Sequence, residues 1–402
     1  MKQSLESLAL FGGAPAFGDK LHVGRPNIGN RERFLDRVNG ILDARVLSNS
    51  GPYEQELERR ISEEIGAAHC IAVCNGTIAL EMAIRALDLT GEVIVPSFTF
   101  IATVHVLHWL NLTPVFCDVD PLTHNLDPRS VERLVTPRTS AILGVHLWGR
   151  PCDVPALTAI AARHHLKLLF DAAHAFRCGQ DGTMVGNFGN AEVFSFHATK
   201  WFNTFEGGMV ATNDAALGAR IRLMRNFGFH GYDTVDHVGT NGKMHEVSAA
   251  MGLTSLESAD EFVDANRRNY LDYERQLRGL PGVRLVSFEE SQRTTYAYVV
   301  LEIDEAVTGV SRDALQQTLW AENVIARRYF YPGCHRMEPY RTLYPDAGAL
   351  LPVTERLAQR VLILPTGTAV SAGDVSTIAA VLRTALGHAE AIRDRTSRVA
   401  IS

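Results

Sequence analysis

The sequence predicts an α/β protein with a large domain built on a mostly parallel sheet and a smaller α+β domain toward the C-terminus. Short β-branched runs alternate with amphipathic stretches through the first two-thirds of the chain, as expected for right-handed βαβ crossovers. This rhythm changes near Gly252. The length of 402 residues is also too great for one ordinary core. We therefore expect a large domain at 1–252 and a small domain at 253–402.

The elements of the large domain follow one another as strand and helix. The predicted strands are His69–Val73, Glu92–Val95, Pro114–Val119, Ser140–Val145, Lys167–Phe170, Ala191–Phe196 and Met209–Thr212. The predicted helices between them include Thr77–Leu87, Ile101–Trp109, Pro128–Leu134 and Val154–His164. In an open parallel sheet, ligands bind beyond the carboxyl ends of the strands, so functional residues are sought directly after each strand.

The smaller domain is expected to begin with a long helix. A polar-apolar pattern predicts this helix over Glu257–Leu277, and strands are expected at Ala297–Ile303 and Ile325–Phe330. A closing helix is expected over Asp374–Leu386, and the charged tail after Gly387 is expected to be frayed.

Composition excludes several classes of protein. Hydrophobic residues make up 46% and charged residues 21% of the chain, as in a folded globular protein. The net charge of −6 without a basic segment argues against a nucleic-acid partner, and no apolar run reaches the roughly 18 residues of a membrane span. The N-terminus lacks the apolar core of a signal peptide, and the 6 cysteines are scattered without a C-x-x-C pair. We expect a cytoplasmic protein with reduced thiols.

Two segments resemble metal-binding motifs, but each lacks a residue that the motif requires. The helix-like run that begins at Met244-His245-Glu246 has Ala249 where a second ligand histidine is needed. The Asp118-x-Asp120 pair opens like a calcium loop, but Thr123 replaces the turn glycine. We expect no metal site.

Lysine is rare, which limits the candidates for an amine nucleophile. The chain contains only Lys2, Lys20, Lys167, Lys200 and Lys243. Lys200 lies on the loop after a predicted buried strand, where a carbonyl cofactor could be held. On spacing alone, a lysine in such a loop is more often a solvated or ion-paired residue.

Other residues that follow strands fit the same chemistry. Asp171 is a carboxylate at the end of a buried strand, where it needs a cation such as a pyridinium nitrogen, or serves as a helix N-cap. Gly76 and Thr77 open a helix and could bind a phosphate, and Ser195 could add a hydroxyl to it. Phe100 could lie against a flat cofactor, although core packing is the more common role. In chain order, these features are a phosphate-binding step, an aromatic ring, a buried acid and an amine. Together they describe a site for pyridoxal phosphate.

With these residues in place, the chain resembles the DegT/StrS-type sugar-nucleotide aminotransferases, which belong to the fold-type I pyridoxal-phosphate enzymes. The matching segments are Asn75–Leu80, Pro96–Phe100, Val145–Gly149, Asp171–Ala175, Phe194–Lys200 with Glu206–Gly208, Gly239–Met244 and Leu364–Gly367. The block from Ser195 to Lys200 with its Glu-Gly-Gly is the most specific of them. Three further segments, Leu47–Pro52, Asn226–Phe229 and Tyr331–His335, resemble the 4-aminotransferases that act on TDP-4-keto-6-deoxyglucose in desosamine-type antibiotic sugar pathways.

The resemblance implies a role for each matching residue. It implies that Lys200 bonds covalently to pyridoxal 5'-phosphate, that Asp171 binds the pyridine nitrogen, and that Phe100 stacks on the ring. It assigns Gly76, Thr77 and Ser195 to the phosphate of the cofactor, and it places His174 near the ring hydroxyl. Asn241 aligns with a residue that the family delivers from the neighbouring subunit to the phosphate, which implies a homodimer with shared active sites. Gly242 stands where the family usually has an aromatic residue. Tyr329 and His335 would face the sugar.

The implied activity is transfer of an amino group from L-glutamate to the 4-keto carbon of TDP-4-keto-6-deoxy-D-glucose. Amination at carbon 3 or of a cyclitol ketone, and a non-catalytic sensor that binds pyridoxal phosphate, are the alternatives. A sugar dehydratase of this fold would carry His in place of Lys200. The sequence leaves open the regiochemistry and stereochemistry of amination, the nucleotide base and the identity of the amino donor.

Overall fold

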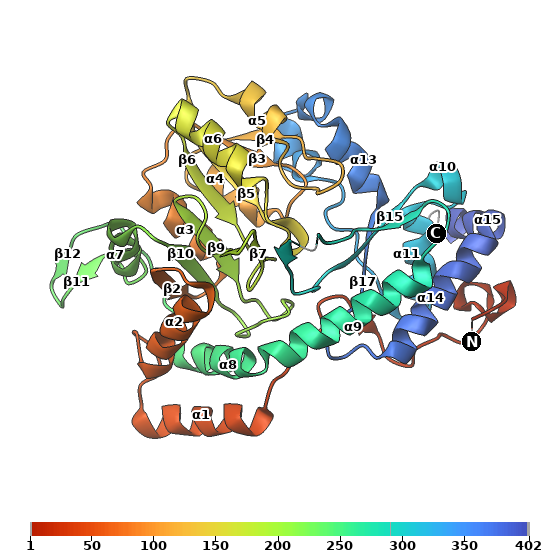
Figure 1. Cartoon of the computed structure of the whole chain (residues 1–402), viewed down its shortest axis with the longest axis horizontal. Helices are drawn as coiled ribbons and strands as arrows, with labels where there is room; N and C mark the ends of the chain where they lie inside the picture. The colour runs from red at the N-terminus through yellow and green to blue at the C-terminus, as the bar shows by residue number, and fades with distance from the viewer. Residues whose placement is uncertain (1, 290, 400–402) are drawn as a thin grey trace.

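A seven-stranded sheet forms the centre of the larger unit in the computed structural model, which describes residues 2–289 and 291–399 (Figure 1). Its order is β2-β10-β9-β6-β5-β3-β4, and only β10 runs antiparallel to its neighbours. The strands are β2 (His69–Val73), β3 (Glu92–Pro96), β4 (Thr113–Cys117), β5 (Thr139–Val145), β6 (Lys167–Asp171), β9 (Ala191–Ser195) and β10 (Gly208–Thr212). The predicted α/β fold and each of these predicted strands are confirmed, with small differences at the ends.

Helices cover both faces of this sheet because its strands are apolar on both sides. In β3, Val93 and Val95 pack in one core while Ile94 packs in the opposite one. The first core is covered by α3 (Gly76–Ala86), α4 (Ala102–Trp109) and α7 (Ala215–Met224). The opposite face is covered by α2 (Pro52–Ile65), α5 (Pro128–Leu134), α6 (Val154–His164) and α8 (Glu246–Glu257).

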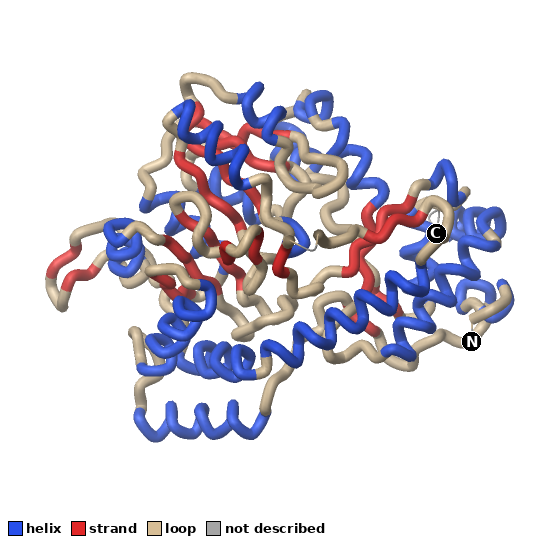
Figure 2. Tube along the Cα trace, viewed as in Figure 1, coloured by secondary structure: helices blue, strands red, loops and turns tan. Residues whose placement is uncertain are grey.

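The smaller unit is an antiparallel sheet with helices around it (Figure 2). Its strands are β13 (Val283–Leu285), β15 (Val299–Ile303) and β17 (Val361–Leu364), and its main helices are α9 (Ala259–Leu277), α11 (Arg312–Ala321) and α14 (Ala372–Gly387). The predicted helix from Glu257 corresponds to α9, which is separated from α8 by a break at Ser258. Ser371 and Asp374 form a capping box that starts α14.

The N-terminal residues lie with the smaller unit, although the sequence predicts them in the large domain (Figure 1). Lys2 Nζ forms an ion pair of 2.7 Å with Glu322, and Leu8 is fully buried in the core of the smaller unit. Strand β1 (Leu21–His22) pairs in parallel with β16 (Val324–Ile325). The chain then crosses to the larger unit and forms α1 (Arg31–Ala44).

Two predictions for the C-terminal part are wrong. The tail after Gly387 is helical rather than frayed, because α15 (Ala389–Val399) buries Ile392 in the core of the smaller unit. The predicted strand Ile325–Phe330 is reduced to β16 and one isolated bridge at Arg327, because the chain then turns toward the large domain.

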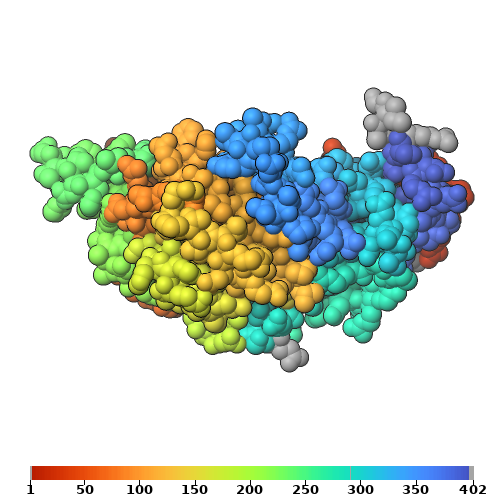
Figure 3. All heavy atoms as spheres, turned by 90° about the horizontal axis from the view of Figure 1, so that it is seen from above, coloured from red at the N-terminus to blue at the C-terminus, as the bar shows by residue number. Residues whose placement is uncertain are grey.

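The remaining elements are short. They are β7 (Gly179–Gln180), β8 (Thr183–Met184), β11 (Phe229–His230), β12 (Thr234–Val235), β14 (Gln292–Arg293), α10 (Glu305–Thr308), α12 (Tyr340–Leu343), α13 (Pro352–Arg360) and the 3₁₀ turns Leu5–Ser7, Ala9–Phe11, Leu147–Gly149, Cys334–Arg336 and Ala347–Leu350. The β11–β12 hairpin projects from one end of the molecule (Figure 3). Among the described residues, no helix has both the length and the apolar character to cross a membrane.

Candidate active site

A cavity of about 670 Å³ lies at the carboxyl ends of the central strands, where the larger and smaller units meet. It is lined by loops that follow β2, β3, β6 and β9 and by residues of the smaller unit. The cavity brings together most of the site residues that the sequence predicts: Gly76, Thr77, Phe100, Asp171, His174, Ser195, Lys200 and Tyr329.

Lys200 presents an unpaired amine to this cavity. Its backbone N–H donates to the carbonyl of His197 at 2.8 Å, which closes the tight loop after β9. Among the described residues, no group hydrogen-bonds or ion-pairs with its Nζ. Burial lowers the pKa of Lys200 to about 8, and the negative charge of Asp171 partly opposes this shift. The site therefore makes a neutral amine available near physiological pH.

Asp171 is a buried carboxylate whose charge lacks a cation. Its side chain lies at the end of β6, and the residue is only 6% exposed. Oδ2 accepts a hydrogen bond of 2.8 Å from Thr103 Oγ1, and Oδ1 accepts one of 3.0 Å from the N–H of Ala173. In the described chain no cation forms an ion pair with it. A buried charge of this kind requires a partner, and a protonated ring nitrogen in the cavity would supply one.

The N-terminus of α3 opens onto the same cavity. Asn75 caps the helix by accepting the N–H of Ile78 at 2.9 Å, while Gly76 and Thr77 line the cavity with Ser195. A Cβ at Gly76 would lie 2.8 Å from the Cβ of Ser195, so only glycine allows the two loops to approach this closely. The free N–H groups of a helix N-terminus and two hydroxyls are donors that could hold a phosphate.

Aromatic rings form the wall between the acid and the smaller unit. His174 lies against Trp148 and Tyr298, with ring centroids 5.7 and 4.2 Å away. Burial lowers the pKa of His174 well below its usual value, so the ring is neutral. Trp148 Nε1 donates to Nδ1 of His124 at 3.0 Å, which fixes the orientation of the indole. The ring of Phe100 is 60% exposed and lines the cavity, where a flat cofactor would cover it.

The structure does not bring His335 or Asn241 into this cavity. His335 is 2% exposed, and its ring nitrogens lie 2.7 Å from Ser97 Oγ and 2.8 Å from Glu355 Oε1, so neither is available to a sugar. Asn241 is exposed and pairs with Asn226 through an isolated bridge. It lies on the outer surface of the large domain rather than in the site of its own chain.

Three residues of the site were missed from the sequence as candidates: Thr103, Trp148 and Tyr298. Trp148 stands in the segment Val145–Gly149 that carries the resemblance, and this position was the available signal. Nothing in the sequence separates Thr103 from an ordinary buried threonine. Tyr298 belongs to the predicted strand Ala297–Ile303, where an aromatic residue is typical of packing.

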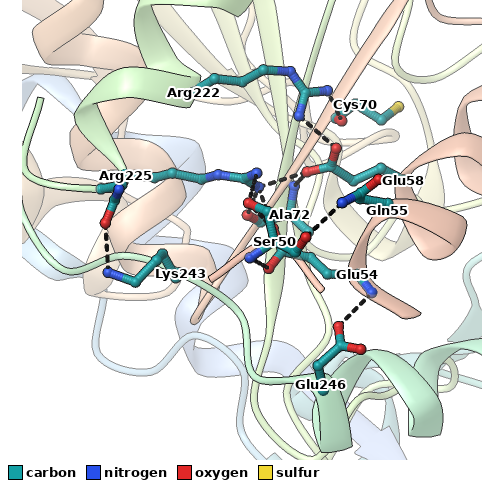
Figure 4. A network of polar contacts seen from close by, with 11 residues as sticks. Ser50, Glu54, Gln55, Glu58, Cys70, Ala72, Arg222, Arg225, Lys243 and Glu246 are labelled. Atoms are coloured by element: carbon teal, nitrogen blue, oxygen red, sulfur yellow. Dashed lines mark hydrogen bonds and ion pairs between the residues drawn. The ribbon is translucent and has the colours of Figure 1, made fainter. Parts of the chain in front are cut away.

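A buried ion network lies beside β2, the strand that leads into α3 (Figure 4). Arg225 Nη1 lies 2.7 Å from Glu54 and 2.6 Å from Glu58, and it donates to the carbonyl of Ala72 in β2 at 2.7 Å. Burial raises the pKa of Glu54 to about 7, against the opposing charge of Arg225. The backbone carbonyl of Arg225 also accepts the N–H of Gly242. This network joins β2, which leads into α3, to the segment that carries Asn241.

Comparison with known proteins identifies the family of this chain. A model of the DegT/DnrJ/EryC1/StrS aminotransferase family matches residues 29–383. A dTDP-4-amino-4,6-dideoxy-D-glucose transaminase of Shigella dysenteriae is 37% identical over 365 residues, which cover 90% of this chain and 98% of the relative. A GDP-perosamine synthase of Caulobacter vibrioides is 35% identical over 373 residues, covering 90% and 97%.

Solved structures lead to the same family. The crystal structure of DesI, determined in the presence of its TDP-sugar product, is 50% identical in sequence. It superimposes with a TM-score of 0.93 and covers 98% of this chain and 100% of its own. The similarity extends over nearly the whole chain, and so includes every element that surrounds the cavity. The protein belongs to the DegT/DnrJ/EryC1/StrS aminotransferase family.

Proposed function

We propose that this protein is a pyridoxal-phosphate-dependent aminotransferase that moves an amino group from L-glutamate to the 4-keto carbon of TDP-4-keto-6-deoxy-D-glucose, in deoxyaminosugar biosynthesis of the antibiotic type. The observation that carries the proposal is the unpaired amine of Lys200 beside the buried, cation-free Asp171 in one cavity. The name of the Shigella relative, a dTDP-4-amino-4,6-dideoxy-D-glucose transaminase, supports a dTDP-linked sugar aminated at carbon 4, and the TDP-sugar product of DesI supports the same nucleotide.

The residues of the cavity fit pyridoxal phosphate. Gly76, Thr77 and Ser195 would hold its phosphate, Phe100 would cover the ring, and Asp171 would bind the ring nitrogen. The chemistry that this group supplies when bound is an aldehyde carbon that carries the amino group and a ring that accepts electrons.

The protein's own residues perform the proton transfers. Lys200 Nζ, whose pKa burial lowers to about 8, would accept the proton from the α-carbon of glutamate and pass it to the aldehyde carbon of the cofactor. In the second half-reaction it would take a proton from that carbon and deliver it to carbon 4 of the sugar. Asp171 keeps a proton on the ring nitrogen, because its buried negative charge favours a cation there. His174 is neutral, and its ring fixes the wall against which the cofactor would lie.

We further propose a homodimer with shared active sites, in which Asn241 reaches the phosphate of the neighbouring subunit. Asn241 is exposed and does not line its own cavity, and the nearby surface carries exposed apolar side chains. Phe227, Tyr232 and Val238 are 47%, 96% and 75% exposed on and beside the projecting β11–β12 hairpin. Exposed apolar side chains gathered in this way mark an interaction surface.

The free thiols support a location in the cytoplasm. All 6 cysteines of the sequence lie within the described residues and none forms a disulfide. Burial raises the pKa of the five buried thiols, with Cys334 at about 12, so these cysteines are unreactive core residues.

The proposal is tested by supplying the purified protein and pyridoxal phosphate with L-glutamate and candidate keto-sugar nucleotides. We expect 2-oxoglutarate to form in equal amount with an aminated sugar, and NMR to locate the new amine at carbon 4. An amine at carbon 3, or on a cyclitol, would replace this proposal with the alternative aminotransferase. A protein that turns yellow with the cofactor but does not bleach with glutamate would be a sensor.

A further inference from the structure

Two arginines on the cavity lining have free guanidinium groups. Arg25 and Arg327 both line the cavity and both are exposed. Neither guanidinium hydrogen-bonds or ion-pairs with any residue that the structure describes, and Arg327 contacts only the ring of Tyr329, whose centroid is 5.3 Å from its Cζ. The adjacent Arg328 differs, because it pairs with Asp313 at 3.1 Å and does not line the cavity.

The fold brings these arginines together from opposite ends of the chain. Strands β1 and β16 pair in parallel, with Leu21 opposite Val324 and His22 opposite Ile325. Arg25 and Arg327 follow the same ends of these two strands, shortly after the paired residues. The parallel pairing therefore places both cations at one edge of the cavity.

The segment that carries Arg25 is held in place from both sides. We call residues 23–27 the N-terminal strap. Asn27 is 2% exposed, donates to the carbonyl of Trp201 at 2.9 Å and accepts the N–H of Thr368 at 3.0 Å. At Gly24, φ is +73°, and a Cβ would lie 2.9 Å from the carbonyl oxygen of Thr199. The strap thus lies directly against the loop of Lys200 and is held by contacts within the chain itself.

The carboxylates that line the cavity do not pair with these two guanidinium groups, which therefore remain available to a ligand. Of the carboxylates that line it, Asp171 is held by Thr103 and Ala173, and Glu206 lies 3.4 Å from His197. A guanidinium is a planar donor that matches phosphoryl oxygens in a bidentate manner. Because both arginines are exposed, the group that they bind lies on the solvent side of the cavity.

We propose that Arg25 and Arg327 bind the diphosphate of the nucleotide-linked sugar and thereby direct its hexose toward Lys200. This inference rests on the proposed function and names the residues that select its substrate. A diphosphate offers two adjacent charged groups, one for each guanidinium. The amino donor is much smaller than the cavity of about 670 Å³, and its α-carbon must lie at Lys200 instead.

The test compares Arg25→Ala and Arg327→Ala with Arg328→Ala, which removes an equal charge from outside the cavity. The probe is dTDP, titrated calorimetrically into the cofactor-loaded protein. We expect each cavity variant to weaken dTDP binding by about tenfold or more, because a charge-assisted contact to phosphate is lost. The control should bind dTDP as the unchanged protein does. Bleaching of the cofactor by glutamate should keep its rate in all three variants.

The outcomes separate the two proposals. The conservative change Arg327→Lys should recover part of the dTDP affinity, since the charge remains but the bidentate geometry is lost. Unchanged dTDP affinity in both alanine variants would overturn the inference, as would loss of the glutamate reaction with intact dTDP binding, which would assign the arginines to the donor's carboxylates. If the unchanged protein neither binds dTDP nor aminates a nucleotide sugar, the proposed function itself fails and this inference with it.

Discussion

Thr103 donates a hydrogen bond of 2.8 Å from its hydroxyl to Oδ2 of Asp171. Thr103 lies on α4 and is fully buried, whereas Asp171 lies at the end of β6. The bond therefore connects the helix that follows the Phe100 loop to the acid that we assign to the ring nitrogen. Together with the N–H of Ala173, it fixes the orientation of this carboxylate.

Replacing Thr103 with valine keeps the shape of the side chain and removes the donor. We expect Thr103→Val to lower kcat by about tenfold, because a hydrogen bond to a buried charge contributes about 1.5–3 kcal/mol. Steady-state kinetics with saturating glutamate and sugar nucleotide measures this. Thr99→Val is the control, since that hydroxyl contacts Thr103 at 3.1 Å and not the acid. Equal effects of the two variants would show that the bond to Asp171 has no special role.

The amine of Lys200 determines how cofactor capture depends on pH. Because burial lowers its pKa to about 8, its neutral fraction increases as pH rises through 8 and is nearly complete one unit above. We expect the rate at which the cofactor-free protein binds pyridoxal phosphate, followed by absorbance, to rise with a midpoint near pH 8. A midpoint near 10.4, the value of an exposed lysine, would contradict this environment. Lys200→Ala should show no covalent capture, and borohydride should leave no labelled peptide.

The sequence was sufficient for the central sheet but not for the outer parts of the fold. Strands such as β2 and β6 are largely apolar runs, and this local pattern is enough to predict them. The ends of these strands direct attention to Gly76 and Asp171 as candidate site residues, but the pattern alone leaves their roles open. Arg25 and Arg327 could not be found in this way. Their proximity depends on the pairing of β1 with β16 across about 300 residues, and no local pattern predicts such a pairing.

For His335, by contrast, the sequence identifies the residue but not the contacts of its side chain. Its position beside Tyr331 and Pro332 in a matching segment suggested a sugar contact, but the fold uses both ring nitrogens for structural bonds to Ser97 and Glu355. Sequence resemblance preserves the residue without showing which way its side chain points.

His335→Ala therefore tests a structural role. We expect the free energy of unfolding, measured with urea, to fall by about 2–4 kcal/mol because Ser97 loses a buried partner and a cavity is left. The KM for the sugar nucleotide should change by less than about threefold, since no substrate contact is removed. His230→Ala is the control: this ring is exposed on the β11–β12 hairpin, where its pair with Asp236 contributes little. A large rise in KM at unchanged stability would restore the sugar-binding role.

Helix α15 is expected to contribute to the stability of the smaller unit. Ile392 is fully buried there, and Arg395 Nε donates to the carbonyl of Leu10 at 3.1 Å, which links the two termini. Ile392→Ala should lower the free energy of unfolding by about 2–5 kcal/mol, whereas the exposed neighbouring change Arg393→Ala should cost less than about 0.5 kcal/mol. Chemical denaturation measures both. Similar small effects would mean that the tail is frayed, as its charge first suggested.

Shared active sites can be tested by mixing two inactive variants. Lys200→Ala removes the amine, and Asn241→Asp places a negative charge where the proposed dimer delivers a phosphate ligand. A hybrid dimer then has one site with both changes and one with neither, so random pairing should restore about a quarter of the original activity. Lys200→Ala mixed with Asp171→Asn is the matched control, because these residues line the same cavity of one chain and no hybrid contains an intact site. Absence of recovery in the first mixture, when both variants are folded and dimeric, would place Asn241 outside the neighbouring site. Equal recovery in the control would show that the gain in activity does not depend on Asn241.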